Sequence, residues 1–153
     1  MESKITDIYE YLAVDTTLST SGQPTEAQLV SVAHAGFRVV INLALHNDPR
    51  YSLRDEPSLA RKLGMEYIHI PVQFDAPTEA DLLAFFAAME RHQGEKVLAH
   101  CAANMRVSAF LGLYRAIKLD QPVEQAFSLM KTIWEPNPVW ATFISVMLGK
   151  QGR

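Results

Sequence analysis

Strand-like and helix-like segments alternate along this chain, and this alternation constrains its fold more than any other feature of the sequence. Short apolar runs rich in β-branched residues predict strands at 37–45, 66–72 and 95–102. Apolar residues at helical spacing predict helices at 25–36, 57–63, 78–93, 105–118, 122–134 and 138–149. The pattern therefore predicts an α/β fold, with a mainly parallel central sheet of roughly four to five strands and helices on both faces. The opening segment 9–24 is expected to add a short strand or hairpin.

Local signals mark where several of these helices begin or end. Thr25 and Gln28 have the spacing of a capping box, and Gly36 is a natural helix stop. The sequence Pro-Thr-Glu-Ala precedes two of the expected helices, which we interpret as two similar caps rather than a repeat. Asn137 is expected to cap the last helix. A length of 153 residues, with no linker or low-complexity segment, predicts a single domain over residues 1–153.

Charge and cysteine content exclude several kinds of partner. A net charge of -3 argues against a broad surface for nucleic acid or anionic lipid, and the longest apolar runs are too short to span a membrane. The N-terminus lacks the basic and apolar segments of a signal peptide, and nothing in the sequence indicates an oligomeric state. Cys101 is the only cysteine, so an intramolecular disulfide is impossible and a reducing, cytoplasmic location is expected. No two of the five histidines have a metal-ligand spacing, so we expect no metal site and no cofactor.

The segment HCAANMRVS, residues 100–108, joins an expected strand to an expected helix and contains the strongest candidate site. Backbone N–H groups of such a loop converge on one point, where the helix N-terminus adds partial positive charge. The loop therefore suits a tetrahedral oxyanion and favours the thiolate form of Cys101. Arg106 supplies a planar pair of donors for two oxygens, and Ser108 can donate to the sulfur. Without these neighbours, a lone cysteine at a strand end would be interpreted as a buried core residue.

Other chemistry-bearing residues are expected near the same edge of the sheet. Ligands of parallel α/β sheets bind beyond the carboxyl ends of the strands. His46, Asp75 and Cys101 fall at or just past such ends, so we expect them on one rim of the sheet. The polar loop after the first long strand contains four candidates for the rim of a pocket: His46, Asn47, Arg50 and Arg54. The alternative interpretation is that these are solvated loop residues.

Three stretches of the chain resemble a known family. VLAHCAANMRVS resembles the signature of the protein tyrosine and dual-specificity phosphatase superfamily, in which His-Cys is followed by five variable residues, Arg, and Ser or Thr. YIHIPVQFDAPTEADLLAFFAAME is similar to the strand, acid loop and helix that precede this signature. LSTSGQPTEAQL and GFRVVINL resemble the bacterial phosphatase-like branch related to beta-lactamase-hydrolase-like proteins. Together the matches cover about residues 8–148 and imply a phosphatase-like three-layer α/β sandwich that acts on a phosphorylated substrate without a metal.

The resemblance also implies a role for each residue of the loop. Cys101 is implied to be the nucleophile, Ser108 to stabilise it as a leaving group, and His100 to orient the loop by hydrogen bonds. Asp75 in QFDAPT matches the general acid in position, and Asp81, expected inside the following helix, is the weaker alternative. The residues implied to bind phosphate are Ala102, Ala103, Asn104, Met105 and Arg106.

Arg106 departs from the family pattern, because four residues rather than five separate it from Cys101. Ser108 keeps its offset and Val107 stands in the usual arginine place, so the loop itself is not shortened. One position on a helix rotates the base of a side chain by about 100°. A displaced guanidinium costs more in catalysis, which depends on positioning, than in anion binding, to which the loop amides contribute. Asn104 stands where the family prefers glycine, and asparagine tolerates a left-handed backbone.

Three functions are compatible with this loop. The leading hypothesis is a phosphatase of the tyrosine or dual-specificity type, in which Cys101 attacks phosphorus while Asp75 protonates the leaving group and then activates water. A rhodanese-like sulfurtransferase is the first alternative, because its tighter loop closes on an arginine after four residues and its cysteine carries a persulfide. A protein that binds a phospho-ligand or small oxyanion with weak or no turnover is the second.

Overall fold

The computed structural model describes residues 4–45 and 52–150, and at its centre is a five-stranded sheet in the order β1-β2-β5-β3-β4. The strands are β1 (Leu12–Ala13), β2 (Leu18–Ser21), β3 (Val39–Asn42), β4 (Glu66–His69) and β5 (Val97–His100). β1 and β2 form the predicted antiparallel hairpin, and the other strand pairs are parallel. The predicted α/β fold class is confirmed, although each strand is shorter than its apolar run.

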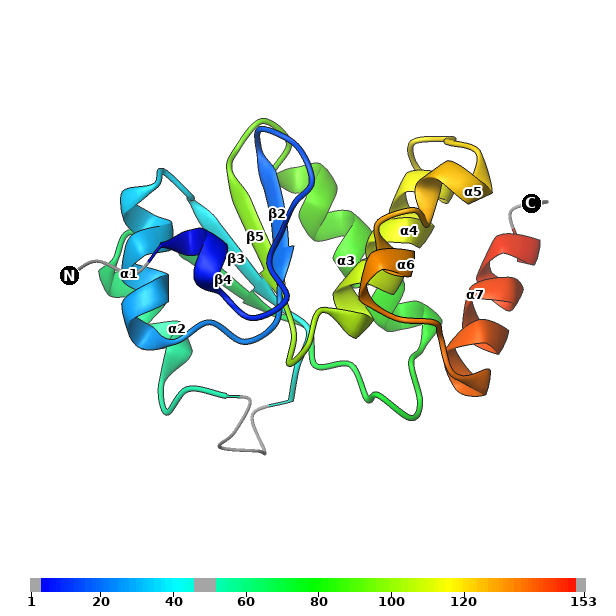
Figure 1. Cartoon of the computed structure of the whole chain (residues 1–153), viewed down its shortest axis with the longest axis horizontal. Coiled ribbons are helices and arrows are strands. Elements are labelled where there is room, and N and C mark those ends of the chain that lie inside the picture. Colours follow the sequence, from blue (N-terminus) through cyan, green and yellow to red (C-terminus); the bar gives the residue numbers. More distant parts are fainter. Residues whose placement is uncertain (1–3, 46–51, 151–153) are drawn as a thin grey trace.

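Helices cover both faces of this sheet (Figure 1). α1 and α2 lie on one face and α3 and α4 on the other, with α5, α6 and α7 packed against α4. The bounds are η1 (a 3-10 helix, Ile5–Asp7), α1 (Glu26–His34), α2 (Glu56–Lys62), α3 (Glu79–Arg91), α4 (Met105–Ile117), α5 (Val123–Ala126), α6 (Met130–Ile133) and α7 (Pro138–Lys150).

Alternate residues of each strand face the two helical layers. Val40 of β3 and Leu98 of β5 pack with Leu29 of α1 in the smaller core. Ile41, the next residue of β3, packs with Phe110 of α4 in the larger core. Because β3 and β5 are buried on both faces, their sequences are continuous apolar runs rather than alternating ones.

Short-range side-chain contacts fix the starts of four helices, among them α2, where the Asp55 side chain accepts from the Ser58 N–H. Thr25 and Gln28 form the predicted capping box of α1, in which each side chain accepts a hydrogen bond from the other residue's backbone N–H. Thr78 and Asp81 form a second box at the start of α3. The predicted cap of α7 is also confirmed, since the side chain of Asn137 accepts a backbone N–H bond of 2.9 Å from that helix.

The single helix predicted over residues 122–134 is wrong, because the structure has the two short helices α5 and α6 there. Phe127 ends α5, and its ring lies so close to Gly112 of α4 that a Cβ on that glycine would overlap the ring. The Ser128 hydroxyl donates to the Gln125 carbonyl at 2.8 Å and stabilises the break. Tertiary packing of one aromatic ring therefore overrides the helical period of the sequence.

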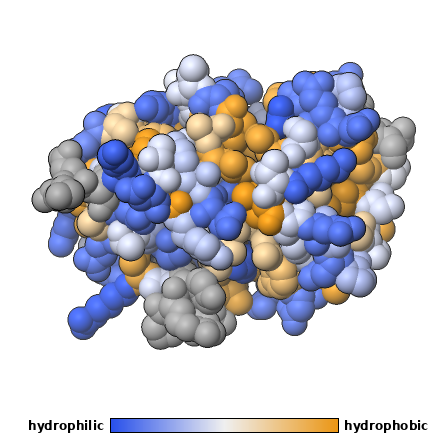
Figure 2. All heavy atoms as spheres, in the orientation of Figure 1, coloured by the Kyte–Doolittle hydropathy of each residue, from blue (hydrophilic) through white to orange (hydrophobic). Residues whose placement is uncertain are grey.

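Polar residues cover much of the outer surface. Figure 2 shows hydrophilic residues over most of one face, with hydrophobic ones scattered among them. Among residues 4–45 and 52–150, no helix is both long enough and apolar enough to cross a membrane. Most large apolar side chains of α3 and α4 pack in the core, whereas Leu83 of α3 is exposed.

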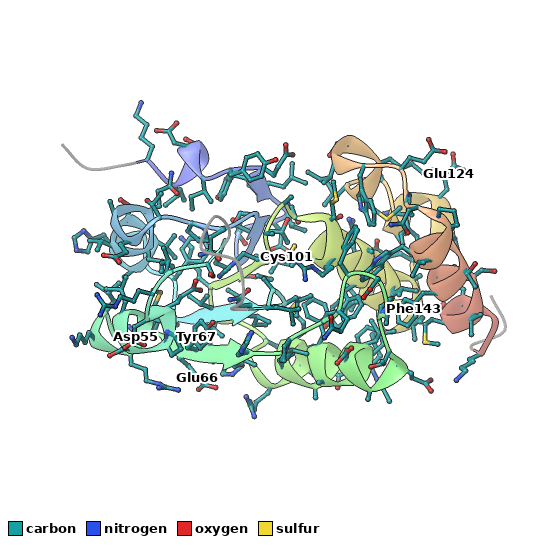
Figure 3. All side chains as sticks on the ribbon, turned by 90° about the horizontal axis from the view of Figure 1, so that it is seen from below. Asp55, Glu66, Tyr67, Cys101, Glu124 and Phe143 are labelled. Carbon is teal, nitrogen blue, oxygen red and sulfur yellow. The ribbon has the colours of Figure 1, made fainter. Side chains whose placement is uncertain are left out.

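The parallel register brings the carboxyl ends of three strands to one level. His100, the last residue of β5, lies opposite Ser21 of β2 and Asn42 of β3. Cys101 follows directly, so it lies at the carboxyl edge in the middle of the sheet, where ligands of such folds bind. Figure 3 looks at the molecule from below, and Cys101 lies near the middle of that view.

Candidate functional site

The loop between β5 and α4 is held against the end of β2. The Cys101 N–H donates to the Ser21 carbonyl at 3.3 Å, and Gly22 forms an isolated antiparallel bridge with Ala103. A Cβ on Gly22 would lie 2.5 Å from the Ala102 carbonyl oxygen, which is closer than such atoms approach. Glycine at this position therefore lets two backbone segments pack in direct contact.

Asn104 has a left-handed conformation, which asparagine tolerates, with φ 63° and ψ 5°. Its side-chain Nδ2 donates to the Glu10 carbonyl at 2.8 Å and to the Thr20 hydroxyl at 3.0 Å, which fixes the end of the loop. Asn104 precedes α4 without making a side-chain cap to that helix. The first-turn N–H groups of α4 therefore lack the side-chain acceptor that α1 and α3 have.

A cavity of about 250 Å³ opens over this loop. Cys101 is only 1% exposed overall, yet it is one wall of this cavity, and the Arg106 side chain is another. The residues that line it are Phe74, Cys101, Ala102, Ala103, Met105 and Arg106. The structure thus brings together five of the residues predicted for the site. It adds Phe74, which only its position next to Asp75 could have indicated.

Arg106 reaches this cavity from the first turn of α4 in spite of its early position in the sequence. Its Nη1 donates to the Val72 carbonyl at 2.9 Å, and its Cζ lies 5.8 Å from the centre of the Phe74 ring. A guanidinium carries five N–H donors, so this bond still leaves others for a ligand. The carbonyl and the aromatic ring fix the guanidinium of the buried Arg106 beside the cavity.

The loop after β4 is fixed to the C-terminal helix. The Trp140 indole N–H donates to the Phe74 carbonyl at 2.7 Å. The Phe74 ring lies 5.7 Å from the Trp134 ring and 6.1 Å from the Trp140 ring, measured between centroids. Asp75 follows in this loop, but its side chain is exposed and does not line the cavity.

Several other predicted site residues lie away from the cavity. The Ser108 hydroxyl donates to the Met105 carbonyl at 3.0 Å rather than to sulfur. Asp81 is part of the capping box of α3, and Arg54 is exposed in a turn before α2. The remaining rim candidates lie outside the described residues, and they are His46, Asn47 and Arg50.

His100 and Glu56 form a buried pair behind the loop. Both side chains are fully buried, and His100 Nε2 lies 2.6 Å from Glu56 Oε2. On its other side, His100 Nδ1 lies 3.2 Å from the Cys101 carbonyl oxygen of the loop, and Glu56 was not predicted. An acidic residue in the first turn of a helix is common, so the sequence carries no signal that separates Glu56 from other helix starts.

Within residues 4–45 and 52–150, no cluster of three or more His, Cys, Asp or Glu side chains is placed to hold a metal ion. The groups gathered at the loop are instead a thiol, a guanidinium and backbone amides, which suit an anion. Attack on a bound electrophile by sulfur is the chemistry that this set of groups can perform.

Comparisons with known proteins identify the family of this chain and proteins that share its fold. Residues 10–118 match the family model of the phosphatase-like domain of beta-lactamase hydrolase-like proteins. The beta-lactamase hydrolase-like protein of Xylella fastidiosa (strain Temecula1) is 35% identical over 116 residues. That match covers 74% of this chain but 25% of the relative, so the chain spans about a quarter of the length of the curated relatives it matches.

Solved structures share the fold over nearly the whole chain. A DUF442 candidate phosphatase from Shewanella putrefaciens CN-32 superposes with a TM-score of 0.85 at 34% identity, covering 97% of both chains. Tk-PTP in its active form superposes with a TM-score of 0.74 at 23% identity, covering 93% of this chain and 95% of the other. The second likeness extends the shared fold to more distant sequences.

Proposed function

We propose that this chain, which belongs to the family of phosphatase-like domains of beta-lactamase hydrolase-like proteins, hydrolyses phosphomonoesters through a phosphocysteine intermediate. The observation that carries this proposal is that Cys101 and Arg106 are two walls of one cavity at the uncapped N-terminus of α4. Phosphoryl transfer from a phosphomonoester to sulfur needs three groups at one point: a nucleophile, a guanidinium with two parallel donors, and helix N–H groups without a side-chain acceptor.

In the first proposed step, the Cys101 thiolate attacks phosphorus in line with the leaving oxygen. The S–P bond forms while the P–O bond to the leaving group breaks, and Asp75 gives its proton to the departing oxygen. The amides of Ala102, Ala103, Asn104 and Met105, together with the Arg106 guanidinium, bind the phosphoryl oxygens. Asp75 directly follows Phe74, which lines the cavity, and this adjacency supports the acid role.

In the second proposed step, water attacks the phosphorus and the S–P bond breaks. Asp75, now a carboxylate, accepts the proton of the water, so the products are inorganic phosphate and the original thiolate. Ser108 eases departure of the sulfur by donating to it, for which its hydroxyl has to turn from the Met105 carbonyl that it now contacts. No metal or cofactor takes part in either step.

We also propose the type of phosphatase, its class of substrate and its location in the cell. The motif around Cys101 and the acid loop support a phosphatase of the tyrosine or dual-specificity type with a phosphorylated substrate as its partner. The nucleophile must stay reduced to act, which supports a cytoplasmic location. The acidic net charge of -3 supports a substrate other than nucleic acid or a membrane surface.

Turnover of 4-nitrophenyl phosphate by the wild-type protein and by Cys101→Ser tests this function. We expect wild-type turnover, a drop in kcat of about 10³-fold or more in Cys101→Ser, and sulfate binding by both proteins. A folded wild-type protein that binds sulfate without any turnover would contradict the proposal and indicate a phospho-ligand binder. A mass gain of roughly 32 Da on Cys101 after treatment with thiosulfate, without turnover of the phosphate, would indicate a sulfurtransferase instead.

A further inference from the structure

Glu56 is buried at a helix position where the chain otherwise exposes its glutamates. It is the first residue of α2, as Glu26 is of α1 and Glu79 is of α3. Glu26 and Glu79 are exposed, whereas Glu56 has no exposed surface. The helix dipole favours an acid at all three positions, but it does not require burial, and glutamate is almost never fully buried unless paired. A specific role for the Glu56 carboxylate therefore needs to be sought in its contacts.

Both oxygens of Glu56 have side-chain partners near the Cys101 loop. Oε2 lies 2.6 Å from His100 Nε2, and Oε1 accepts a hydrogen bond of 2.8 Å from Gln23 Nε2. The backbone N–H of the same Gln23 donates to the Ala102 carbonyl at 3.0 Å. Glu56 thus connects the start of α2 with the last residue of β5 and with the segment after β2.

The two ring nitrogens of His100 both face acceptors. Nε2 faces the Glu56 carboxylate, and Nδ1 lies 3.2 Å from the Cys101 carbonyl oxygen. A neutral imidazole has only one N–H, so it can satisfy one of these acceptors and not both. The pair is fully satisfied when it holds two protons, one on Nδ1 and one shared between Nε2 and the carboxylate.

Among the described residues, Tyr67 on β4 is a titratable neighbour of Glu56, and its phenol does not supply this second proton. Burial, and after it the negative charge of Glu56, raises the pKa of the Tyr67 phenol on β4 above its ordinary value, while Arg61 of α2 acts in the opposite direction. Tyr67 accepts a hydrogen bond of 3.0 Å from Asn42 Nδ2 and stays protonated and neutral in the working pH range.

The hydrogen bonds to the Cys101 and Ala102 carbonyls also orient the amide groups of the residues that follow them, Ala102 and Ala103. In a trans peptide, the N–H points opposite to the C=O of the same plane. His100 holds the Cys101 carbonyl and Gln23 holds the Ala102 carbonyl, so the planes that contain the Ala102 and Ala103 N–H groups are fixed. Ala102 and Ala103 both line the cavity above the sulfur.

We propose that Glu56 is a positioning residue for the phosphatase reaction: its contact with Nε2 of His100 keeps an N–H on Nδ1 directed at the Cys101 carbonyl, and through His100 and Gln23 it orients the loop amides that stabilise the thiolate and the phosphoryl group. This inference rests on the proposed function for its catalytic part. Its effect on the state of Cys101 can be measured without any turnover.

The test compares wild type with Glu56→Ala, Glu56→Gln and the matched control Glu26→Ala, which removes a glutamate from the same helix position in α1. One readout is kcat/KM for 4-nitrophenyl phosphate, and the other is the rate at which iodoacetamide alkylates Cys101 at pH 6 and at pH 10. Alkylation at pH 6 reports how readily the thiolate forms, and at pH 10 it reports access to the sulfur.

We expect Glu56→Ala to lower kcat/KM by about 10- to 100-fold and to lower alkylation at pH 6 by about tenfold, with alkylation at pH 10 unchanged. Glu56→Gln should stay within about threefold of wild type in both readouts, because its amide can donate to Nε2 and accept from Gln23. Glu26→Ala should match wild type in both readouts.

A folded Glu56→Ala protein with wild-type alkylation at pH 6 would overturn the proposal, and so would a Glu56→Gln protein as impaired as Glu56→Ala. If Glu56→Ala does not fold, Gln23→Ala decides, with an expected loss of about threefold at pH 6 and with no loss as the contrary result. If wild type proves inactive on the phosphate ester while the alkylation pattern holds, the positioning role stands and the proposed function fails.

Discussion

The N-termini of α3 and α4 differ, although the two helices have the same length of 13 residues. α3 begins with a complete capping box of Thr78 and Asp81, so its own side chains satisfy its first donors. α4 begins after Asn104, in a left-handed conformation and without a side-chain cap, and it faces the cavity beside Cys101. The corresponding donors of α4 have no side-chain acceptor at the N-cap, which is the arrangement that our proposed anion site needs.

Burial compensates α4 for the missing cap. Val107, Ala109, Phe110 and Leu113 have no exposed surface, and α4 packs against α3, α5, α6 and α7. Most helical stability in proteins comes from such packing rather than from the ends. A helix surrounded by other helices can therefore leave its first N–H donors without a side-chain acceptor, whereas a helix that is half exposed is stabilised by its own cap.

Apart from Cys101→Ser, the variant that should lower activity most is Arg106→Ala, in the first turn of α4. We expect kcat/KM for an aryl phosphate to fall about 10³-fold, which is roughly 4 kcal/mol, because the guanidinium beside the cavity is lost. The control is Arg91→Ala in the last turn of α3, whose exposed ion pair with Glu66 should matter less than about twofold. Retention of more than a third of the activity by Arg106→Ala would mean that Arg106 does not contact the reacting group.

Gly22→Ala tests the contact that shapes the loop before α4. Its Cβ would lie 2.5 Å from the Ala102 carbonyl and 2.7 Å from the Tyr9 ring, so the backbone must move. We expect a loss of about 1–3 kcal/mol in the free energy of unfolding and weaker phosphate binding by calorimetry. Gly149→Ala in α7, where a Cβ meets open space, is the control and should leave phosphate affinity unchanged. Equal phosphate affinity in both variants would show that the loop tolerates displacement.

Asn104→Ala and Asn104→Gly separate the two contributions of the residue before α4. Both lose the side-chain bonds to Glu10 and Thr20, but only alanine is strained at φ 63°. Urea unfolding should therefore find Asn104→Ala less stable than Asn104→Gly by about 1–2 kcal/mol. Equal stabilities would argue against the left-handed conformation.

Thr78→Ala should have the smallest effect and should act on stability alone. Removing the cap of α3 is expected to lower the free energy of unfolding by about 1 kcal/mol, measured by urea unfolding. Thr25→Ala in α1 should behave in the same way, and kcat should stay at the wild-type value in both variants. A fall in kcat comparable to that of Arg106→Ala would contradict the claim that the starts of α1 and α3 contribute to stability and not to activity.

The parts of the molecule that were predicted from sequence depend on residues close together in the chain. The capping box of Thr25 and Gln28 spans one helical turn, and the left-handed conformation of Asn104 is a preference of a single residue. The Cys101 loop was found because its strand, turn and helix are contiguous. Side-chain chemistry and backbone preference act at short range, so such features can be recognised without the fold.

The parts that were missed depend on distant segments. Phe74 enters the cavity from the loop after β4, and Glu56 reaches His100 from α2, 44 residues away in the chain. Phe127, at the break between α5 and α6, packs its ring against Gly112 of α4. Nothing near these residues in the sequence sets them apart, since an acid at a helix start or an aromatic ring in an apolar segment is ordinary.

The central claim is that an anion binds at the start of α4 over Cys101. Backbone amide NMR of the ¹⁵N-labelled protein, titrated with inorganic phosphate, tests it most directly, because it observes the starts of α1, α3 and α4 at once. We predict saturable shifts that are largest at the amides of residues 102–106 and negligible at the capped starts 26–28 and 79–81. No saturable shift at residues 102–106, or shifts of equal size at all three starts, would contradict an anion site over Cys101.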